Sequence, residues 1–360
     1  MTDTEPTGRA PVFCSIVPPH LLDTLARHGD PALSGPARRT LERDAAERTR
    51  RSAPRARPAE AARARRPAPH HPNRTVHDAE HGTDLPGRAV REEGDPASRD
   101  TTVNRAYGGL GATFELYQKV YGRDSLDDRG AELVATVHYD RDYNNAFWNG
   151  EQMVFGDGDG KIFRDFTIPV DVVGHELTHG VTQHEADLTY TGQAGALNES
   201  MSDVFGSLIK QYALGQSAAE ADWLIGAGLL APHVTGSALR SMKAPGTAYD
   251  DDVLGRDPQP ATMADYVHTT DDNGGVHINS GIPNHAFYLF ATELGGPAWE
   301  RAGQVWYDVL TGGDLARDAS FADFAGLTVR AARHRYGRSG GSAEERAVVK
   351  AWTQVGVETE

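Results

Sequence analysis

The 360-residue chain has a single cysteine, Cys14, so no disulfide can form within it. No stretch approaches the ~20 consecutive apolar residues that a membrane-spanning helix needs, so a membrane protein of that kind is not expected. The first 20 residues lack both a basic start and an apolar run, so no secretory signal is predicted. We expect the protein in the cytoplasm, or exported without a recognisable signal. The net charge of −15 disfavours general binding of nucleic acid.

Charge is divided unevenly along the chain. Residues 1–73 carry 13 basic and 8 acidic side chains, a net charge of +5, which leaves −20 on the remainder. Eleven of the basic residues are arginines between Arg38 and Arg66, among alanines and prolines. Such a composition buries little apolar surface and predicts a mobile, solvated linker over about 38–66. The apolar cluster FCSIVPPHLLDTLARHG before it favours a small docking element over the alternative, a disordered tail.

The composition and the hydrophobic spacing of the sequence change after Asn73. Residues 74–170 contain short runs such as LVATVHY and QMVFGDG, divided by Gly, Asn and Asp, which predict strands and hairpins. From about Asp171 apolar residues recur at helical spacing, in PVDVVGHELTHGV, ALNESMSDVFGSLIKQYAL, NHAFYLFATEL and AEERAVVKAWTQVGV. These patterns predict an α+β fold: a pro-segment over 1–73, a β-rich lobe over 74–184 ending in a bridging helix, and a helical lobe over 185–360.

The bridging helix pattern carries the motif His175-Glu176-Leu-Thr-His179. Residues four apart lie on one helical face, so both imidazoles can bind one metal ion. Glu176 lies about 100° round the helix from His175, where its carboxylate can address a water on that ion. Zinc is the expected metal, because it takes nitrogen and carboxylate ligands in a tetrahedral site with one position open.

A third ligand is predicted on the next helix pattern. Glu199 follows His179 after 19 residues, and Asp203 lies one turn further on. One carboxylate can bind the metal while the other holds a ligand imidazole from behind, and Asn198 can support the second imidazole. The alternative is an acidic face on a surface helix. The apolar neighbours of these acids argue against that alternative, because buried carboxylates need a partner.

Six segments in this order resemble the thermolysin family of zinc metallopeptidases, and the resemblance covers most of residues 75–357. Those segments are Tyr143–Gly150, Val154–Gly160, Asp171–Thr182, Gly195–Asp203, Leu239–Met242 and Asp272–Gly281. The stretch from Cys14 to Leu21 is similar to the short pro-segment of the protealysin-like subgroup, and not to the long one of secreted thermolysins.

The resemblance implies a role for each matching residue. It makes His175, His179 and Glu199 the zinc ligands and Glu176 the general base. It implies that His277 and Tyr190 donate hydrogen bonds to the oxyanion, with Asp272 orienting His277. Asn145 and the backbone of Ala146 would hold the substrate as an added strand, and Arg240 would bind the carbonyl after the scissile bond. The apolar pocket for the residue on the amine side of the cut would consist of Phe163, Phe166, Val172, Leu229 and Leu239.

Some of these residues also have simpler interpretations. His277 can be a core histidine satisfied by Asp272, although the Asn-Gly-Gly before it is typical of an exposed turn at a cleft. Tyr190 can be a packed aromatic. Cys14 can bind zinc as a thiolate in the precursor, or be a small buried apolar residue.

The chain departs from the family at the double calcium site of secreted thermolysins. The corresponding positions hold Asp171, Lys210, Asp222, Leu224 and Ala227. Three of the five offer no carboxylate, and the ammonium of Lys210 can neutralise Asp171 or Asp222 without a metal. Calcium remains possible elsewhere, but this pair of sites is predicted to be lost.

The predicted function is that of a zinc-dependent neutral endopeptidase, which cleaves on the amino side of bulky apolar residues. We expect it to be made as a latent precursor. Its own pro-segment would lie over the cleft, with Pro18 and Pro19 resisting hydrolysis, until a cut between Arg50 and Val76. The partners are then a peptide or protein substrate and the pro-segment. The alternatives are a catalytically inert module of the same fold and a different zinc hydrolase.

Overall fold

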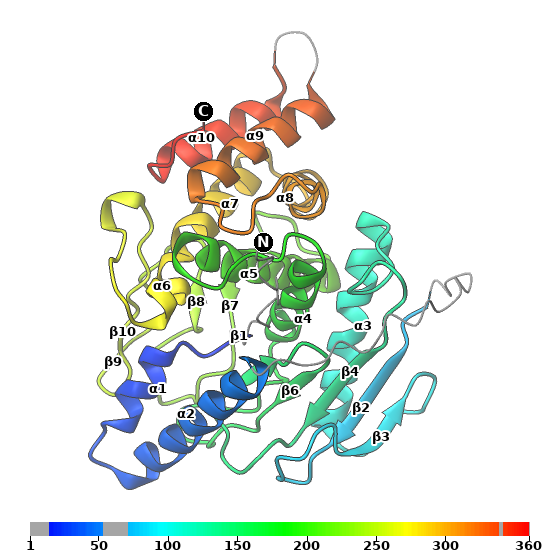
Figure 1. Cartoon of the computed structure of the whole chain (residues 1–360), viewed down its shortest axis with the longest axis vertical. Helices are drawn as coiled ribbons and strands as arrows, with labels where there is room; N and C mark the ends of the chain where they lie inside the picture. Colours follow the sequence, from blue (N-terminus) through cyan, green and yellow to red (C-terminus); the bar gives the residue numbers. More distant parts are fainter. Residues whose placement is uncertain (1–13, 53–70, 338–340, 360) are drawn as a thin grey trace, which may run out of the picture.

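A mixed β-sheet forms the centre of the N-terminal lobe (Figure 1). The computed structural model describes residues 14–52, 71–337 and 341–359. Its six-stranded sheet has the order β1-β5-β6-β4-β2-β3. β2 pairs in parallel with β4, as does β4 with β6, and the other pairs are antiparallel. The strands are β1 (Cys14–Ser15), β2 (Arg74–Asp78), β3 (Arg88–Glu92), β4 (Leu133–Val137), β5 (Ala146–Trp148) and β6 (Met153–Phe155).

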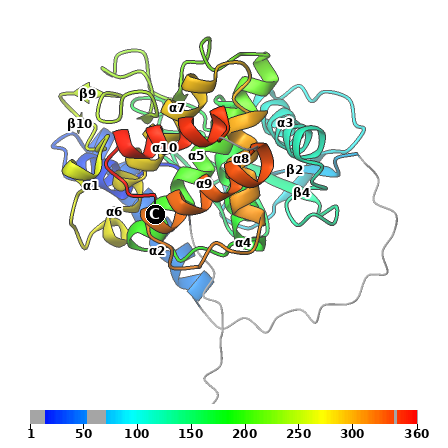
Figure 2. The ribbon, with the colours of Figure 1, turned by 90° about the horizontal axis from the view of Figure 1, so that it is seen from above.

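The prediction of strands and hairpins alone over 74–170 is wrong, because a 21-residue helix, α3 (Thr101–Tyr121), lies within it. Figures 1 and 2 both place α3 beside β2 and β4. Its N-cap, Asp100, accepts hydrogen bonds from the backbone N–H groups of Thr102 and Val103. Glycines interrupt its apolar pattern, and one of them has a packing reason: a Cβ at Gly109 would lie 2.8 Å from the Val173 side chain. The glycines that interrupt the apolar pattern therefore also let α3 pack closely against the helix that contains Val173.

The structure contains all four of the helices predicted from apolar spacing, the bridging helix and three in the helical lobe. These are α4 (Val170–His184), α5 (Gly192–Leu214), α7 (Gly281–Leu294) and α10 (Ala343–Gln354). The structure adds α6 (Asp272–Asn279), α8 (Arg301–Thr311) and α9 (Phe321–Tyr336), the short 3₁₀ helix η1 (Met263–Asp265), and the short strands β7 (Leu224–Ile225), β8 (Arg240–Ser241), β9 (Asp250–Asp251) and β10 (Gly255–Arg256). Figure 1 shows α4 and α5 between the sheet and the C-terminal helices. This confirms the α+β architecture.

Helices α4 and α5 pack with their backbones close together. A Cβ at Gly206 of α5 would lie 2.6 Å from the carbonyl oxygen of Asp171 on α4. Only glycine fits there, so the two helices approach more closely than side chains would otherwise permit. The close approach brings His175 on α4 within reach of Glu199 and Asp203 on α5.

The arginine-rich segment is partly helical, which corrects the prediction of a mobile linker over 38–66. Helix α2 runs from Pro31 to Ser52 and follows α1 (Pro19–Ala26). One face of α2 is buried, since Thr40 and Asp44 are at most 2% exposed. Exposed arginines of α2 pair with acids in the loop between β4 and β5, Arg39 with Asp142 and Arg43 with Asp140. Residues 53–66 lie outside the described residues.

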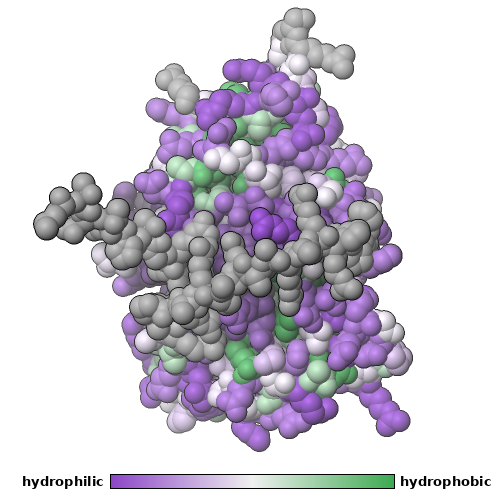
Figure 3. Space-filling model, turned by 45° about the vertical axis from the view of Figure 1, so that its right-hand side comes forward, coloured by the Kyte–Doolittle hydropathy of each residue, from purple (hydrophilic) through white to green (hydrophobic). Residues whose placement is uncertain are grey.

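The surface is mainly hydrophilic. Figure 3 shows a face on which hydrophobic residues form only small separate patches. Leu214, 61% exposed, is the one large apolar side chain left open in the described ranges. In the same ranges, no helix combines the length and the apolar character needed to cross a bilayer.

Candidate active site

Two histidines on α4 point their Nε2 atoms at each other. The Nδ1–H of His175 donates to Asp203, and that of His179 donates to Asn198, each over 2.8 Å. With Nδ1 protonated, each neutral ring has its lone pair on Nε2. The two Nε2 atoms are 3.1 Å apart. Burial lowers the pKa of His179 to about 3, which keeps that ring in the neutral form that binds metals.

Glu199 of α5 completes this cluster. Its Oε2 lies 3.5 Å from the Nε2 of His175, and its Oε1 lies 3.4 Å from the Nε2 of His179. The carboxylate is fully buried, and Oε2 has no hydrogen-bond donor among the described residues. Tyr190 donates its hydroxyl to Oε1. Two imidazole lone pairs and an unsatisfied buried carboxylate oxygen fit a divalent cation bound between them.

Glu176 faces the same point from α4. The backbone N–H of Trp148 on β5 donates to its Oε2 over 2.9 Å, while Oε1 is buried without a hydrogen-bond donor in the described part of the chain. Burial raises the pKa of the Glu176 carboxyl well above its ordinary value, and the nearby Glu199 raises it further. A carboxylate with a raised pKa is suited to accept a proton near neutral pH.

Asp203 is the centre of a buried hydrogen-bond network behind the histidines. In addition to His175 it accepts two hydrogen bonds from Arg240, from Nε and Nη2, and one from Asn284, each over 2.8 Å. Burial alone would raise the pKa of Asp203, but Arg240 and His175 outweigh that effect and hold it below its usual range. Asp203 therefore fixes the ring of His175 and the guanidinium of Arg240 at the same time.

His277 lies across the cleft on α6. Its Nδ1–H donates to Asp272 over 2.6 Å, and its backbone N–H donates to the other oxygen of that carboxylate over 2.9 Å. Burial disfavours the charged ring, but Asp272 and Glu199 together raise the pKa of His277 to about 9. At neutral pH the ring is thus a charged donor whose Nε2–H points into the cleft.

The pro-segment occupies this cleft. β1 pairs antiparallel with β5, which places Cys14 opposite Trp148. The contacts continue past the strand: Ile16 N–H donates to the carbonyl of Ala146 over 3.1 Å, and Val17 N–H donates to Oδ1 of Asn145 over 3.0 Å. From the other wall, Arg240 donates to the carbonyl of Ile16 and His277 to that of Ser15, each over 3.0 Å. Pro18 then caps α1, and Pro19 is its first residue.

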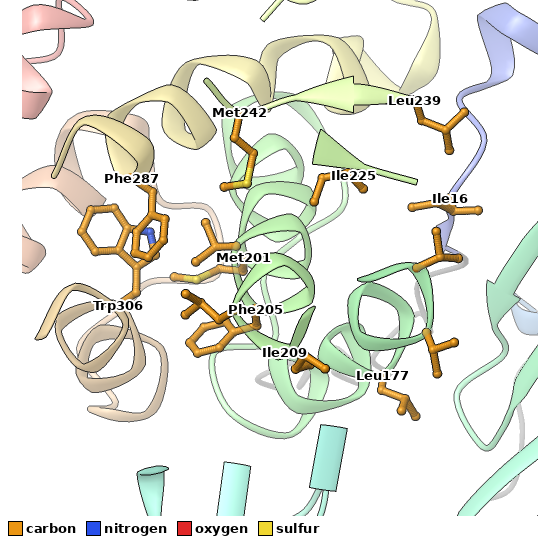
Figure 4. Packing of buried hydrophobic residues seen from close by; sticks show 14 of the residues in the cluster. Ile16, Leu177, Met201, Phe205, Ile209, Ile225, Leu239, Met242, Phe287 and Trp306 are labelled. Carbon is orange, nitrogen blue, oxygen red and sulfur yellow. The ribbon is translucent and has the colours of Figure 1, made fainter. Parts of the chain in front are cut away.

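The five residues expected to form the apolar pocket are buried in the protein core. All are at most 2% exposed and belong to the same large hydrophobic cluster as Ile16: Phe163, Phe166, Val172, Leu229 and Leu239. Figure 4 shows Ile16 at the same end of this cluster as Leu239 and Ile225. The Ile16 side chain, which follows β1, is thus buried on the side of the core where Leu239 lies.

Cys14 lies at the metal cluster. Its Sγ, a nitrogen of His179 and a carboxylate oxygen of Glu199 are all within 4.8 Å of one another. The cysteine is 2% exposed. Strand pairing with β5 therefore brings a thiol, a good zinc ligand, to the site where the other ligands converge.

Away from the cleft, the buried Lys210 forms ion pairs with both acids of the expected calcium positions, the buried Asp171 and the exposed Asp222. Its Nζ lies 2.7 Å from Asp171 and 2.8 Å from Asp222, and it donates to the carbonyl of Leu224 over 2.6 Å. Burial disfavours the ammonium, but Asp171 and Asp222 outweigh it and raise the pKa of Lys210.

The sequence matches two halves of one protein family. Residues 65–183 match the thermolysin metallopeptidase catalytic domain, and residues 186–357 match the thermolysin metallopeptidase α-helical domain. The chain belongs to the thermolysin family. It is therefore a zinc-dependent metalloendopeptidase.

Relatives show which branch of the thermolysin family it resembles. It is 51% identical to an extracellular metalloprotease of Pectobacterium carotovorum, over 96% of this chain and 97% of that one. It is 40% identical to a thermolysin of Alicyclobacillus acidocaldarius, over 78% of this chain and 50% of that one. The solved precursor of protealysin from Serratia proteamaculans is similar with a TM-score of 0.86 and 51% identity, covering 96% of this chain and 99% of that one. The similarity to a precursor extends through the pro-segment, so this thermolysin-family chain is a latent precursor.

Two groups of this site could not be predicted from the sequence. Asn284 holds Asp203 from helix α7, 81 residues further on. The backbone N–H of Trp148 holds Glu176. Neither a lone asparagine in an apolar helix nor a backbone donor leaves a pattern that sequence reading can detect.

Proposed function

We propose that His175, His179 and Glu199 hold the catalytic zinc and that Glu176 is the general base. When bound, zinc activates water and polarises the substrate carbonyl. Glu176 takes a proton from the attacking water and delivers it to the leaving nitrogen. The observation that best supports this assignment is a pair of buried carboxylate oxygens without a hydrogen-bond donor in the described part of the chain. One belongs to Glu199, which lies beside both histidines, and the other belongs to Glu176.

The groups around the zinc would orient the reacting atoms. In this proposal His277 donates to the developing oxyanion, because it already donates to the carbonyl of Ser15 and Asp272 keeps it charged. Tyr190, whose hydroxyl lies 3.3 Å from the Nε2 of His277, assists. Asp203 and Asn198 fix the tautomers of His175 and His179, so that both Nε2 atoms remain available.

A substrate would bind as an added strand on β5. The support is the pro-segment itself, whose backbone uses Asn145, Ala146 and Arg240 in an extended conformation. The side chain after the scissile bond would enter the pocket of Phe163, Phe166, Val172, Leu229 and Leu239.

This pocket predicts the products of digestion. The mature enzyme should cut casein and unstructured peptides on the amino side of Leu, Ile, Val or Phe, because the pocket has no buried charge to pair with Lys or Arg. Mass spectrometry of the products gives the map, and a zinc chelator should abolish digestion. A product map dominated by cuts on the amino side of Lys or Arg would refute the pocket. Chelator-resistant digestion would refute the zinc mechanism, and an absence of any digestion would favour the inert module.

We also propose that Lys210 replaces the calcium pair of secreted thermolysins. Its ammonium neutralises Asp171 and Asp222 where a divalent cation would otherwise be needed. The melting temperature should therefore differ by less than about 2 °C between calcium-free and millimolar-calcium buffer, since only a ligand that binds the folded state selectively raises it. Differential scanning calorimetry of the Glu176→Gln chain, which would not digest itself, measures this. A rise above about 10 °C would show that a calcium site compensates.

The boundaries of the pro-segment and of the two lobes are also proposed from the sequence. We propose a pro-segment over 1–73, removed by a cut between Arg50 and Val76, followed by lobes over 74–184 and 185–360. We further propose that the peptidase acts outside the cell, as the name of the Pectobacterium relative suggests. Assaying the culture medium and the cell fraction of a producing strain tests this location.

A further inference from the structure

Consecutive backbone groups of the pro-segment match the cleft in register. The carbonyl of Ser15 faces His277, the proposed oxyanion donor. The N–H and C=O of the next residue, Ile16, bind Ala146 and Arg240. The carbonyl before the Ser15–Ile16 bond thus meets the proposed oxyanion donor, and the residue after the bond meets groups proposed to hold the substrate backbone. The Ser15–Ile16 bond therefore lies where a substrate's scissile bond would lie.

The leaving nitrogen of that bond lies on the same strand edge as the general base. β5 accepts the N–H of Ile16 through the carbonyl of Ala146, and the backbone N–H of Trp148 on the same strand donates to Glu176. Glu176 is the group that would protonate this nitrogen as the bond breaks. The Ile16 side chain is fully buried in the apolar cluster of the proposed pocket, and isoleucine is among the residues this pocket should accept.

Peptide bonds bound in this way are cut unless something withholds the water. Cys14, one residue before Ser15, brings its thiol to the cluster of His179 and Glu199. The buried Oε2 of Glu199 has no hydrogen-bond donor in the described ranges, so a cation is needed there, and a thiol at the same point is placed to bind it. A thiolate on that ion takes the position that the attacking water needs.

We propose that Ser15–Ile16 is a cleavage site held intact by Cys14, and that removing the thiol from the metal centre lets the chain cut itself there. This inference rests on the proposed roles of Glu176 and the zinc ligands. The pro-segment then binds as a substrate does, and Cys14 prevents its hydrolysis.

The reaction is ordinary hydrolysis and consumes one water. The water oxygen bonds to the carbonyl carbon of Ser15, Glu176 takes one proton from that water, and the C–N bond to Ile16 breaks. The nitrogen leaves with a proton from Glu176, giving a carboxylate at Ser15 and an amino terminus at Ile16. The cut separates β1 from α1, so the part of the pro-segment paired with β5 loses its covalent link to the helices that anchor it.

The test uses the full 360-residue chain with zinc, as wild type and as Cys14→Ser and Cys14→Ala. Intact-mass measurement and N-terminal sequencing over time should show a new terminus at Ile16 in both variants, forming at least about tenfold faster than in wild type. The control variant Cys14→Ser with Glu176→Gln should remain intact at this bond. Two different replacements guard against one of them disturbing the fold.

A second readout does not depend on catalysis. In the zinc-loaded Glu176→Gln chain, the rate at which a disulfide reagent modifies Cys14 should rise at least about tenfold on adding a zinc chelator, because the ion shields a bound thiolate. An unchanged rate contradicts the role of Cys14 in preventing hydrolysis.

The outcomes separate this inference from the proposed function. If the Cys14 variants digest casein after processing but never open the Ser15–Ile16 bond, the inference about Cys14 is wrong and the peptidase assignment stands. Cutting of wild type at this bond as fast as the variants also overturns it. If the chain with Glu176→Gln digests casein as fast as wild type, the proposed base is wrong and the inference fails with it.

Discussion

Replacing Glu176 with glutamine should lower the rate of peptide hydrolysis by roughly 10²–10⁴-fold, the usual contribution of a general base, with no loss of zinc. Glutamine keeps the shape of the side chain but cannot accept the proton of the attacking water. It can still accept the hydrogen bond from the backbone of Trp148, so the fold around it should persist. The zinc ligands are untouched, because in this assignment Glu176 does not bind the ion.

Two measurements check this result on the processed enzyme: hydrolysis of a defined peptide, and zinc content by elemental analysis. Glu115→Gln is a matched control, since Glu115 lies on the surface of α3 and forms an exposed pair with Lys119. It should retain full activity. Loss of zinc from Glu176→Gln would mean that Glu176 is a ligand and that the roles are misassigned.

Asp203→Ala should produce the largest loss of stability, about 3–5 kcal/mol in the free energy of unfolding. Asp203 and Arg240 are both almost fully buried, and the carboxylate neutralises the guanidinium. Removing it leaves a charge buried without its partner, together with the unsatisfied donors of His175 and Asn284.

Urea unfolding of the precursor, in the Glu176→Gln background to prevent digestion, measures this loss. Glu293→Ala is the control, because Glu293 forms an exposed pair with Lys350 and should change stability by less than about 1 kcal/mol. If Asp203→Ala lowers the free energy of unfolding no more than the control does, the buried network does not support the site. Zinc affinity should also fall, by roughly 10–100-fold, since His175 loses its supporting acceptor.

The zinc cluster could be predicted from sequence because its spacing is local. His175 and His179 are one helical turn apart, as are Glu199 and Asp203, so periodicity alone puts each pair on one face. The four predicted helices followed from the same regular spacing. Helix α3 did not, because glycines such as Gly109 remove apolar side chains where the helix meets α4.

Helix α2 could not be predicted from the sequence, for a different reason. Its composition is that of a disordered segment, and its stability depends on partners far along the chain. Asp44 is buried because Tyr143 and Asn145 donate to it, and Arg43 is held by Asp140. Contacts over about 100 residues of separation leave no trace in local composition, so the segment is predictable only once the surface it covers is known.

Segment 14–19 of the chain closes the cleft of this peptidase. The most direct measurement compares casein digestion by the intact 360-residue precursor and by the processed enzyme, with N-terminal sequencing to confirm each species. The precursor should be inactive or weakly active. Added residues 1–73 should inhibit the processed enzyme, less strongly at high salt because exposed pairs such as Arg39–Asp142 are screened. If the intact precursor digests casein as fast as the processed form, the pro-segment is not an inhibitor and the account is contradicted.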